Sequence, residues 1–378
     1  MHLTTTLLGA FAALSGLTGA VPVVGSRSFS IDATDFPNPN PEQLQAIFKA
    51  ADGKLGNAPP PAKLEKGTLT ALQLIAFNEQ FEVAFFSSFI QNITNNVPGF
   101  EFADQKKKEE LLDILYSVLA QEKLHAINAA NSLKKFDFFV PQPCQYQFPS
   151  TTTREAIQLA EKFTALVMGT LQDVSFLAAK NGDIGTVRGV ASSLGQEGEQ
   201  EGFYRILLSK KPSQKPFLTT NVAAFAFSAV HNFIVPNSCP FELNKIELPI
   251  FPVIDVITGA KDNAIEPRDQ YITFKTNLSG IKAAQPYYGK NGEGLFITYF
   301  SGQLVPFSVP IQNVKWTGES VTFDALLPYE DNVMDGLSVA SLTMKDKFAA
   351  PGDVVEWTLA APGLIQVADR TKAWDSEI

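Results

Sequence analysis

Cysteine and histidine are scarce in this sequence, and their scarcity excludes several kinds of chemistry. The 378 residues contain two cysteines and three histidines. A Ser-His-Asp hydrolase would have to use His125 or His231, and no serine stands in the G-x-S-x-G context of a nucleophile elbow. Two cysteines without nearby histidines also make a poor metal site. The sequence therefore argues against hydrolase and thiol chemistry.

Basic charge and long apolar runs are lacking as well. The formal net charge is −9, whereas a sequence-independent nucleic-acid binder needs clustered lysine and arginine. The basic run at 106–108 is followed at once by two glutamates and is typical of a solvated helix start. After the N-terminal segment, no apolar run of about 20 residues predicts a membrane span. We expect neither a nucleic-acid partner nor a membrane-spanning helix.

Residues 1–20, MHLTTTLLGAFAALSGLTGA, are predicted to be a secretory signal peptide. They contain an apolar run of suitable length and end in small residues, although lysine and arginine are absent from their start. The C-terminal sequence VADRTKAWDSEI is polar and charged, unlike a lipid-anchor or ER-retention signal. We therefore expect a secreted protein, either extracellular or located in a cell wall.

The two cysteines fit that compartment. Cys144 and Cys239 each lie in a proline-containing loop, VPQPCQYQFP and VPNSCPFEL. An oxidising environment favours a disulfide between them, and two buried thiols are the alternative. Asn92 and Asn277 begin N-x-S/T sequons, so they are candidate glycosylation sites.

The chain divides into segments of different composition. Residues 21–67 are punctuated by Pro, Asn and Gly and predict a surface-wrapping arm with a short helix around PEQLQAIFKAA. Residues 68–240 predict a bundle of four long helices with an added shorter helix, and Thr68 or Thr70 is the expected N-cap of the first. This first helix, TALQLIAFNEQFEVAFFSSFIQNI, is apolar on nearly every side, so we expect it to be buried.

A β domain is predicted over residues 241–368, followed by a polar tail at 369–378. Short runs rich in β-branched and aromatic residues are separated here by Gly, Asn and Asp turns. These runs are YITFKTN, GLFITYFSG, NVKWTGESVTFDALL, LSVASLTMKD and VVEWTLAAP. They favour an antiparallel, Ig-like β-sandwich. The predicted fold class is therefore α+β multidomain, with a helical bundle followed by a β-sandwich.

A carboxylate and an imidazole lie one helical turn apart in LAQEKLHA, at Glu122 and His125. The helical half also contains an internal repeat, in which NEQFEVAFF aligns with GTLQDVSFL and AQEKLHA aligns with GQEGEQE. The alignment pairs residues of the two halves as follows: Glu79 with Thr170, Glu122 with Glu197, and His125 with Gln200. A duplicated Glu helix followed by a Glu-x-x-His helix builds a two-metal carboxylate site in a bundle core.

The segments FNEQFEVAFF, LAQEKLHA and GQEGEQEGFYR also carry a resemblance to a known family. Over roughly residues 62–240 the chain resembles the fungal secreted ferritin-like proteins, which are described as stress-response or late-sexual-development proteins. The resemblance implies a ferritin-like bundle, and a C-terminal β region is a feature of longer family members. Because the family's biochemical role is poorly defined, the resemblance implies a fold more than a function.

Several ligands of a ferritin-like di-iron site are missing. Such a site has a glutamate on the third helix, where this chain offers Thr170, Gln172 or Asp173, and a histidine on the fourth, where Gln200 stands. A first metal would keep the ligands Glu79, Glu122, His125 and Glu197, while Gln172 and Gln200 form a degenerate second site. Three outcomes stay open: one bound iron or manganese ion, a metal-free polar network, or a full two-metal site.

Further polar residues have two interpretations each. Glu82 and Asp173 lie one turn from ligand positions, either as hydrogen-bond acceptors near the site or in contact with the surface or the fifth helix. His231 either completes a site at the end of the bundle or is an ordinary partly buried histidine.

The sequence thus leaves three functional hypotheses. The favoured one is a stress- or development-associated scaffold with little or no catalysis, whose β domain contacts a cell-wall or protein partner. The others are a mononuclear iron or manganese oxidoreductase and a protein that sequesters metal. The sequence does not indicate the oligomeric state.

Overall fold

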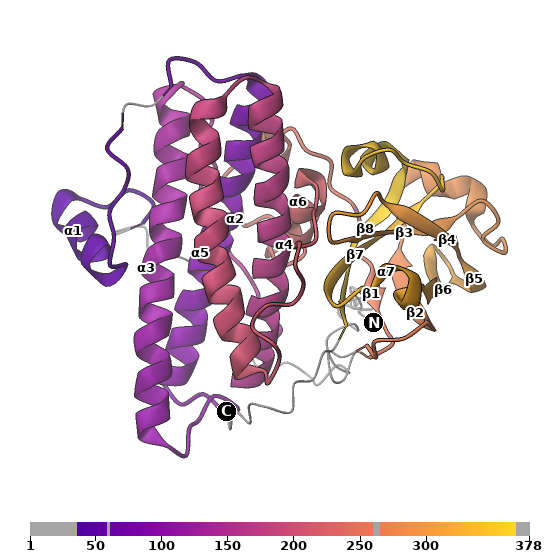
Figure 1. Cartoon of the computed structure of the whole chain (residues 1–378), viewed down its shortest axis with the longest axis horizontal. Coiled ribbons are helices and arrows are strands. Elements are labelled where there is room, and N and C mark those ends of the chain that lie inside the picture. Colours follow the sequence, from indigo (N-terminus) through magenta and orange to yellow (C-terminus); the bar gives the residue numbers. More distant parts are fainter. Residues whose placement is uncertain (1–35, 59–60, 260–264, 368–378) are drawn as a thin grey trace, which may run out of the picture.

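Four long helices lie side by side in the N-terminal half of the chain (Figure 1). The computed structural model describes residues 36–58, 61–259 and 265–367, so the predicted signal peptide, the first part of the arm and the polar tail lie outside the described residues. The four helices are α2 (Lys66–Thr94), α3 (Gln105–Lys135), α4 (Thr153–Lys180) and α5 (Ile184–Leu207). α2 packs chiefly against α3, and α4 against α5, while α2 and α4 join the two pairs.

Aromatic side chains fill the centre of this bundle. Phe85 of α2 meets Phe163 of α4 edge to face with ring centroids 4.9 Å apart, and Phe81 meets Phe163 at 5.3 Å. Such edge-to-face pairs stabilise a core beyond the area that they bury. α2 is buried on nearly all sides, as its continuous apolar sequence predicts.

Side-chain caps fix two of the helix starts. Thr152 accepts a hydrogen bond from the backbone N–H of Glu155 at the start of α4, and Asp104 accepts one from Lys106 at the start of α3. Both caps satisfy amides that have no partner within the helix.

The start of α2 differs from its prediction. The helix begins at Lys66, so Thr68 and Thr70 lie inside it, and the prediction of a threonine N-cap is wrong. The N-cap is Glu65, whose side chain makes no capping hydrogen bond and whose backbone N–H donates to the carboxylate of Asp183. A contact between residues 118 positions apart therefore sets this boundary, and local sequence does not contain it.

Two short helices flank the bundle. α1 (Pro41–Ala50), the short helix predicted within the arm, packs on the outer side of α3. α6 (Ala223–His231) lies between the bundle and the β domain (Figure 1). The predicted disulfide is present: Cys144, in the loop between α3 and α4, is bonded to Cys239, beyond α6.

The C-terminal half forms two four-stranded antiparallel sheets. Their strand orders are β1-β2-β6-β5 and β4-β3-β7-β8. The strands are β1 (Asp255–Val256), β2 (Gln270–Asn277), β3 (Phe296–Ser301), β4 (Phe307–Pro310), β5 (Gln312–Thr317), β6 (Ser320–Leu327), β7 (Gly336–Thr343) and β8 (Thr358–Val367). Buried residues of both sheets form one shared core, so the sheets pack face to face.

Burial patterns show which sheet faces the helices. β6 alternates between half-buried and buried residues, as expected for a strand with one covered face. β7 is buried at every position, because its second face lies against the helices. The sheet that contains β7 and β8 is therefore the middle layer of the molecule.

The strand predictions are correct in outline and wrong at the C-terminal end. Residues 354–357, predicted as part of a strand, belong to the 3-10 helix η3 (Pro351–Trp357), at whose start the Asp353 carboxylate accepts a hydrogen bond from the N–H of Ala350. The strand follows as β8 and continues past Pro362. The short strands β1 and β4 were not predicted.

Remaining short elements are the 3-10 helices η1 (Leu243–Lys245) and η2 (Lys282–Tyr287) and the one-turn helix α7 (Tyr329–Asn332). Residues 241–250, which the sequence assigns to the β domain, contribute apolar side chains to the bundle core, and the first strand begins only at Asp255.

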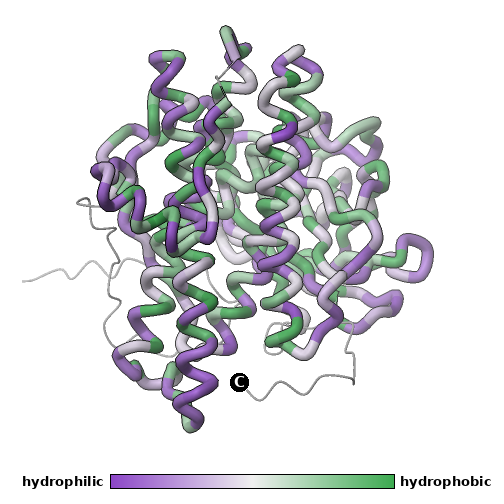
Figure 2. The backbone as a smooth tube through the Cα atoms, turned by 60° about the vertical axis from the view of Figure 1, so that its left-hand side comes forward, coloured by the Kyte–Doolittle hydropathy of each residue, from purple (hydrophilic) through white to green (hydrophobic). Residues whose placement is uncertain are grey.

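Figure 2 shows hydrophobic and hydrophilic residues alternating along the helices, with hydrophilic ones prominent at helix ends and loops.

The helices and the β domain share a further apolar cluster. It contains Leu166 of α4, Phe225 of α6, and Phe300 and Val339 of the middle sheet. The rings of Phe225 and Phe300 stack with centroids 5.6 Å apart. The two halves therefore meet through a packed, apolar interface.

Candidate metal centre

Three helices of the bundle bring four potential metal ligands together. Glu79 comes from α2, Glu122 and His125 from α3, and Glu197 from α5. Each offers a ligand atom within 4.8 Å of the ligand atoms of the other three. Ligands about 2.1 Å from a common ion would lie within about 4.2 Å of one another, so small side-chain movements close the set around one ion.

The imidazole of His125 faces all three carboxylates. Its Nδ1 lies 3.1 Å from Glu122, 3.5 Å from Glu79 and 3.5 Å from Glu197. Residues three apart on a helix share a face, which explains the closest of these contacts. The other two contacts require the packing of α2 and α5 against α3.

The carboxylates of the site are deeply buried and incompletely bonded. Glu122 and Glu197 have no exposed surface, and Glu79 is 1% exposed. Among the described residues, neither oxygen of Glu197 accepts a hydrogen bond, nor does Oε2 of Glu79. A buried charge without partners is costly, and coordination of a cation is one of the few ways to compensate it. The residues present therefore fit a metal ion.

Burial and mutual repulsion alter the acidity of these groups. Burial raises the pKa of Glu79 to about 8 and that of Glu197 to about 7, and the charge of Glu122 acts in the same direction on both. The pKa of His125 is raised well above its ordinary value: burial lowers it, but the charge of Glu79 and the close approach of all three carboxylates to its Nδ1 outweigh burial. The cluster thus retains protons at neutral pH that a divalent ion would displace.

Gln200 occupies the position that the internal repeat pairs with His125. Its amide nitrogen donates to Glu122 over 2.6 Å, while His125 on the other repeat approaches Glu197. Each repeat thus contacts the glutamate of the other, which is the reciprocal pattern expected of a duplicated helix pair. The hydroxyl of Tyr204 donates to the side-chain oxygen of Gln200 and fixes the orientation of its amide.

The third helix of the bundle supplies no ligand to the cluster. Thr170, which the repeat pairs with Glu79, is buried and lines the same small cavity as Glu79. Its hydroxyl donates a hydrogen bond to the carbonyl of Leu166 and accepts one from the side chain of Asn221. Gln172 points elsewhere and accepts a hydrogen bond from Gln303 of the β domain. The assignment of Gln172 to a degenerate second site is therefore wrong. Two residues correspond to about 200° of rotation around a helix, so Thr170 and Gln172 cannot share a face.

Asp173 and Glu82 occupy different environments despite their repeat equivalence. Asp173 accepts a hydrogen bond from the backbone of Ala223, at the start of α6, in agreement with the predicted contact to the fifth helix. Glu82 is fully buried, and one of its oxygens accepts a hydrogen bond from Asn78. Its pKa is raised well above normal by burial, and the charge of Glu197 adds to the effect.

Of the two interpretations that the sequence left open for Glu82, the structure favours the position near the cluster over the surface, because Glu82 is buried and interacts with Glu197, Glu122 and Glu79. Glu82 follows Glu79 by three residues in a helix that is apolar on all sides, and such a carboxylate shares the interior face of its neighbour. His231 at the end of α6 is half-buried and lies outside the described cluster, as an ordinary histidine would.

The two sequons differ in accessibility. Asn277 is exposed at the end of β2, whereas Asn92 is half-buried within the last turn of α2. Asn277 therefore offers the more accessible acceptor.

Comparisons with known proteins assign neither a family nor a function to this chain. The sequence matches neither a model of a known protein family nor a curated protein. Within the described ranges, every helix is too short or too polar to cross a membrane.

Proposed function

We propose that this protein is a secreted, ferritin-like protein whose bundle holds one divalent transition-metal ion. The ligands are the three carboxylates of Glu79, Glu122 and Glu197 and the imidazole of His125. The observation that carries the proposal is Glu197, whose two buried oxygens have no hydrogen bond within the described structure although they lie beside an imidazole.

The donor set favours iron or manganese. Carboxylate oxygens suit Mn²⁺, and imidazole suits iron, whereas zinc and copper sites commonly include more nitrogen or sulfur donors. The Cys144–Cys239 disulfide leaves no free thiol to compete for the ion and is compatible with an extracellular protein. A bound ion would supply positive charge and, in the case of iron, one-electron chemistry.

Binding of one ion rather than two follows from the side chains around the centre. Gln200 donates its amide protons to Glu122, and an amide nitrogen is not a metal ligand. Thr170 uses its hydroxyl within the hydrogen bonds of the bundle. At the two positions that the repeat pairs with Glu79 and His125, a second ion would therefore find a threonine and a glutamine in place of a carboxylate and an imidazole.

The proposed cellular role is that of an extracellular or cell-wall protein with little or no catalysis, associated with stress or development. Its support is the sequence resemblance together with the single-ion centre, because two-electron oxidation in ferritin-like sites uses a pair of metals. We interpret the two packed sheets as an Ig-like sandwich that contacts an external partner. Mononuclear oxidation and metal sequestration are the alternatives that the experiment below separates from it.

The test is elemental analysis of the secreted protein, followed by removal of metal with a chelator and titration with Mn²⁺ or anaerobic Fe²⁺. We expect about one equivalent in the wild type and a large loss in His125→Ala. Ion at 100 times its Kd should stabilise the wild type by about 2.7 kcal/mol. His231→Ala removes a histidine outside the cluster and should bind like the wild type.

Two results decide against the proposal. If wild type and His125→Ala both lack metal and gain no stability from either ion, the cluster is a metal-free polar network. If the ion binds equally to both, it resides elsewhere. Oxygen consumption by the loaded wild type, absent in His125→Ala, would favour the oxidase alternative over binding alone.

A further inference from the structure

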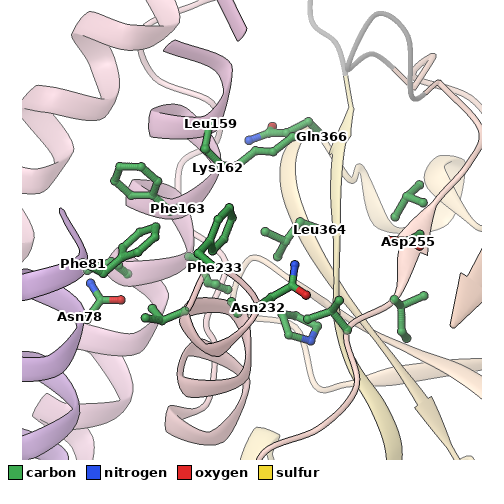
Figure 3. Close-up of a pocket in the computed structure, with 18 of the residues that line it drawn as sticks. Asn78, Phe81, Leu159, Lys162, Phe163, Asn232, Phe233, Asp255, Leu364 and Gln366 are labelled. Carbon is green, nitrogen blue, oxygen red and sulfur yellow. The ribbon is translucent and has the colours of Figure 1, made fainter. Parts of the chain in front are cut away.

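A second candidate site lies between the bundle and the β domain, apart from the carboxylate cluster. It is a cavity of about 130 Å³, lined by α2 and α4, by the end of α6 and by β1 and β8. Figure 3 shows Phe81 and Phe163 on the helical side, Leu364 and Gln366 on the sheet side, and Phe233 between them. The helices and the sheets therefore both contribute to its wall.

Size and composition indicate the kind of molecule that fits. Aromatic rings and branched aliphatic side chains form most of the wall, among them Phe81, Phe163, Phe233, Leu159, Leu166 and Leu364. A cavity of about 150 Å³ with a similar apolar lining accommodates benzene in another protein. The cavity thus has room for one six-membered ring with no more than a small substituent.

One polar side chain in the wall has no partner. Gln366 of β8 is 4% exposed, and neither its amide oxygen nor its amide nitrogen forms a hydrogen bond within the described structure. Buried amide groups are normally paired, because an unmade hydrogen bond costs their full desolvation. Figure 3 shows the side chain of Gln366 extending from β8 toward Leu159 of α4. The mostly apolar wall therefore presents one hydrogen-bond donor group and one acceptor that await a partner.

The charged side chains of the wall already have partners. Lys162 and Asp255 line the cavity and carry opposite charges. Lys162 is attracted to Glu161, and Asp255 is attracted to Lys275, and neither of these partners lines the cavity. An ionised ligand would lose its hydration without an unpaired charge to compensate the loss. The wall therefore favours a neutral molecule.

We propose that this cavity binds a small neutral phenol, with its ring among the phenylalanines and its hydroxyl group at the amide of Gln366. Aromatic rings favour edge-to-face contacts with other rings, which Phe81, Phe163 and Phe233 can provide. A hydroxyl group adds a single heavy atom, and it can either donate to the amide oxygen of Gln366 or accept from its nitrogen. Because the pKa of a phenol is about 10, the ligand is neutral at pH 7.

The proposal does not depend on a metal ion in the bundle, although the cavity is adjacent to the carboxylate centre. Asn78 lines the cavity and also donates a hydrogen bond to Glu82 over 2.8 Å. For this reason the experiment uses chelator-treated protein, so that its result is independent of whether metal binds.

The test titrates this protein with phenol and with toluene by calorimetry at pH 7. The two molecules have nearly the same shape, but toluene carries a methyl group in place of the hydroxyl. We expect one saturable site per chain. Phenol should bind the wild type at least as tightly as toluene, because the amide of Gln366 replaces the hydrogen bonds that the hydroxyl makes in water.

The Gln366→Leu variant should separate the two ligands. Phenol should bind it about tenfold more weakly than the wild type or weaker still, since its hydroxyl would be buried without a partner. Toluene should bind as tightly as before or more tightly, which would also show that the cavity persists. Gln285→Leu is the matched control, because it makes the same change at an exposed position of the β domain outside the cavity. It should bind both ligands like the wild type.

Thermal midpoints check the folding of both variants. Absence of saturable phenol binding to the wild type would show that the cavity holds only water. Phenol binding that Gln366→Leu leaves unchanged would place the hydroxyl elsewhere and overturn the proposal. If Gln366→Leu does not fold, the wild type decides alone, because weaker binding of phenol than of toluene would contradict a hydroxyl partner in the wall.

Discussion

At the scale of single residues, Glu197 is the most informative side chain of the bundle. It is wholly buried, approaches His125 only at 3.5 Å, and carries two oxygens without hydrogen bonds in the described part of the chain. Its pKa of about 7 reflects burial first and the charge of Glu122 second. Because this pKa is raised, the stabilising contribution of Glu197 is complete below pH 4.5 and is lost as the pH rises through 7.

This loss of stability at high pH gives a prediction for the Glu197→Gln variant. At pH 8 the metal-free variant should be more stable than the metal-free wild type by about 1–2 kcal/mol, because the substitution removes a buried charge and its repulsion. With saturating Mn²⁺ the order should reverse, because the wild type gains binding energy and the variant has lost a ligand. Urea unfolding at pH 8, with and without Mn²⁺, measures both differences.

Glu199→Gln is the matched control, since Glu199 is exposed two residues further along the same helix. It should change neither stability nor the response to Mn²⁺. A less stable metal-free Glu197→Gln variant would indicate instead that Glu197 stabilises the bundle through a charge-assisted contact with His125.

The four clustered residues could be predicted from sequence because the internal repeat relates Glu122 of α3 to Glu197 of α5, and His125 follows Glu122 by one helical turn. Glu79 and Glu122 lie at repeated positions, and their helices bring them together. Gln172 could not be placed correctly, because a short alignment does not determine which face of a helix turns inward. The lining of the cavity was also beyond prediction, because Lys162 and Gln366 are separated by about half of the chain and meet only after folding.

At the scale of elements, α4 shows how closely a helix can approach its neighbours. Gly169 lies where the segment 219–221 crosses α4, and a Cβ atom there would come within 2.5 Å of the carbonyl oxygen of Thr219. The backbone N–H of Asn221 also donates to the carbonyl of Gly169. This contact positions the chain that leads into α6.

Gly169→Ala should therefore destabilise the protein. The backbone of residues 219–221 must move, and overpacking of this kind costs about 1–3 kcal/mol. Gly189→Ala in α5 is the control, because its Cβ would meet nothing within 4 Å and alanine favours a helix over glycine by about 1 kcal/mol. Thermal unfolding should show opposite shifts, and equal shifts of the same sign would contradict the close approach of the 219–221 backbone to Gly169.

Element types were predictable for most of the chain, whereas several boundaries were not. Periodicity identified the four long helices, and alternation identified β2, β3, β6 and β7. The segment VVEW has strong β propensity but forms part of η3, because the chain turns there before it enters β8. The start of α2 depends on Asp183, a contact that sequence patterns do not contain.

At the scale of the whole molecule, the helices and the sheets have a common core. Phe225, Phe300 and Val339 belong to one cluster, and Leu337 of β7 accepts hydrogen bonds through its carbonyl from Lys215 and from Thr219. Both faces of β7 are therefore covered within the described part of the chain. The sequence predicts two domains but does not predict this extent of contact between them, which arises from apolar residues on both faces of β7.

A shared core implies that both halves unfold together. All three tryptophans lie in the C-terminal part of the chain, at 316, 357 and 374, so fluorescence reports on that part, while circular dichroism at 222 nm reports mainly on the helices. We expect the two signals to change at the same denaturant concentration. Phe300→Ala should lower both midpoints together, with a loss of about 3–5 kcal/mol, because it opens a space beside Phe225.

Val305→Ala provides the comparison, because Val305 is 60% exposed and its truncation should leave both signals unchanged. If Phe300→Ala shifts the fluorescence transition alone, the sheets unfold independently of the helices. The interface would then be too weak to make the molecule one cooperative unit, and the cavity formed by α4 and β8 would open at lower denaturant than the bundle itself. Coincident transitions would instead mean that whatever stabilises the sheets also stabilises the bundle that holds the four candidate metal ligands.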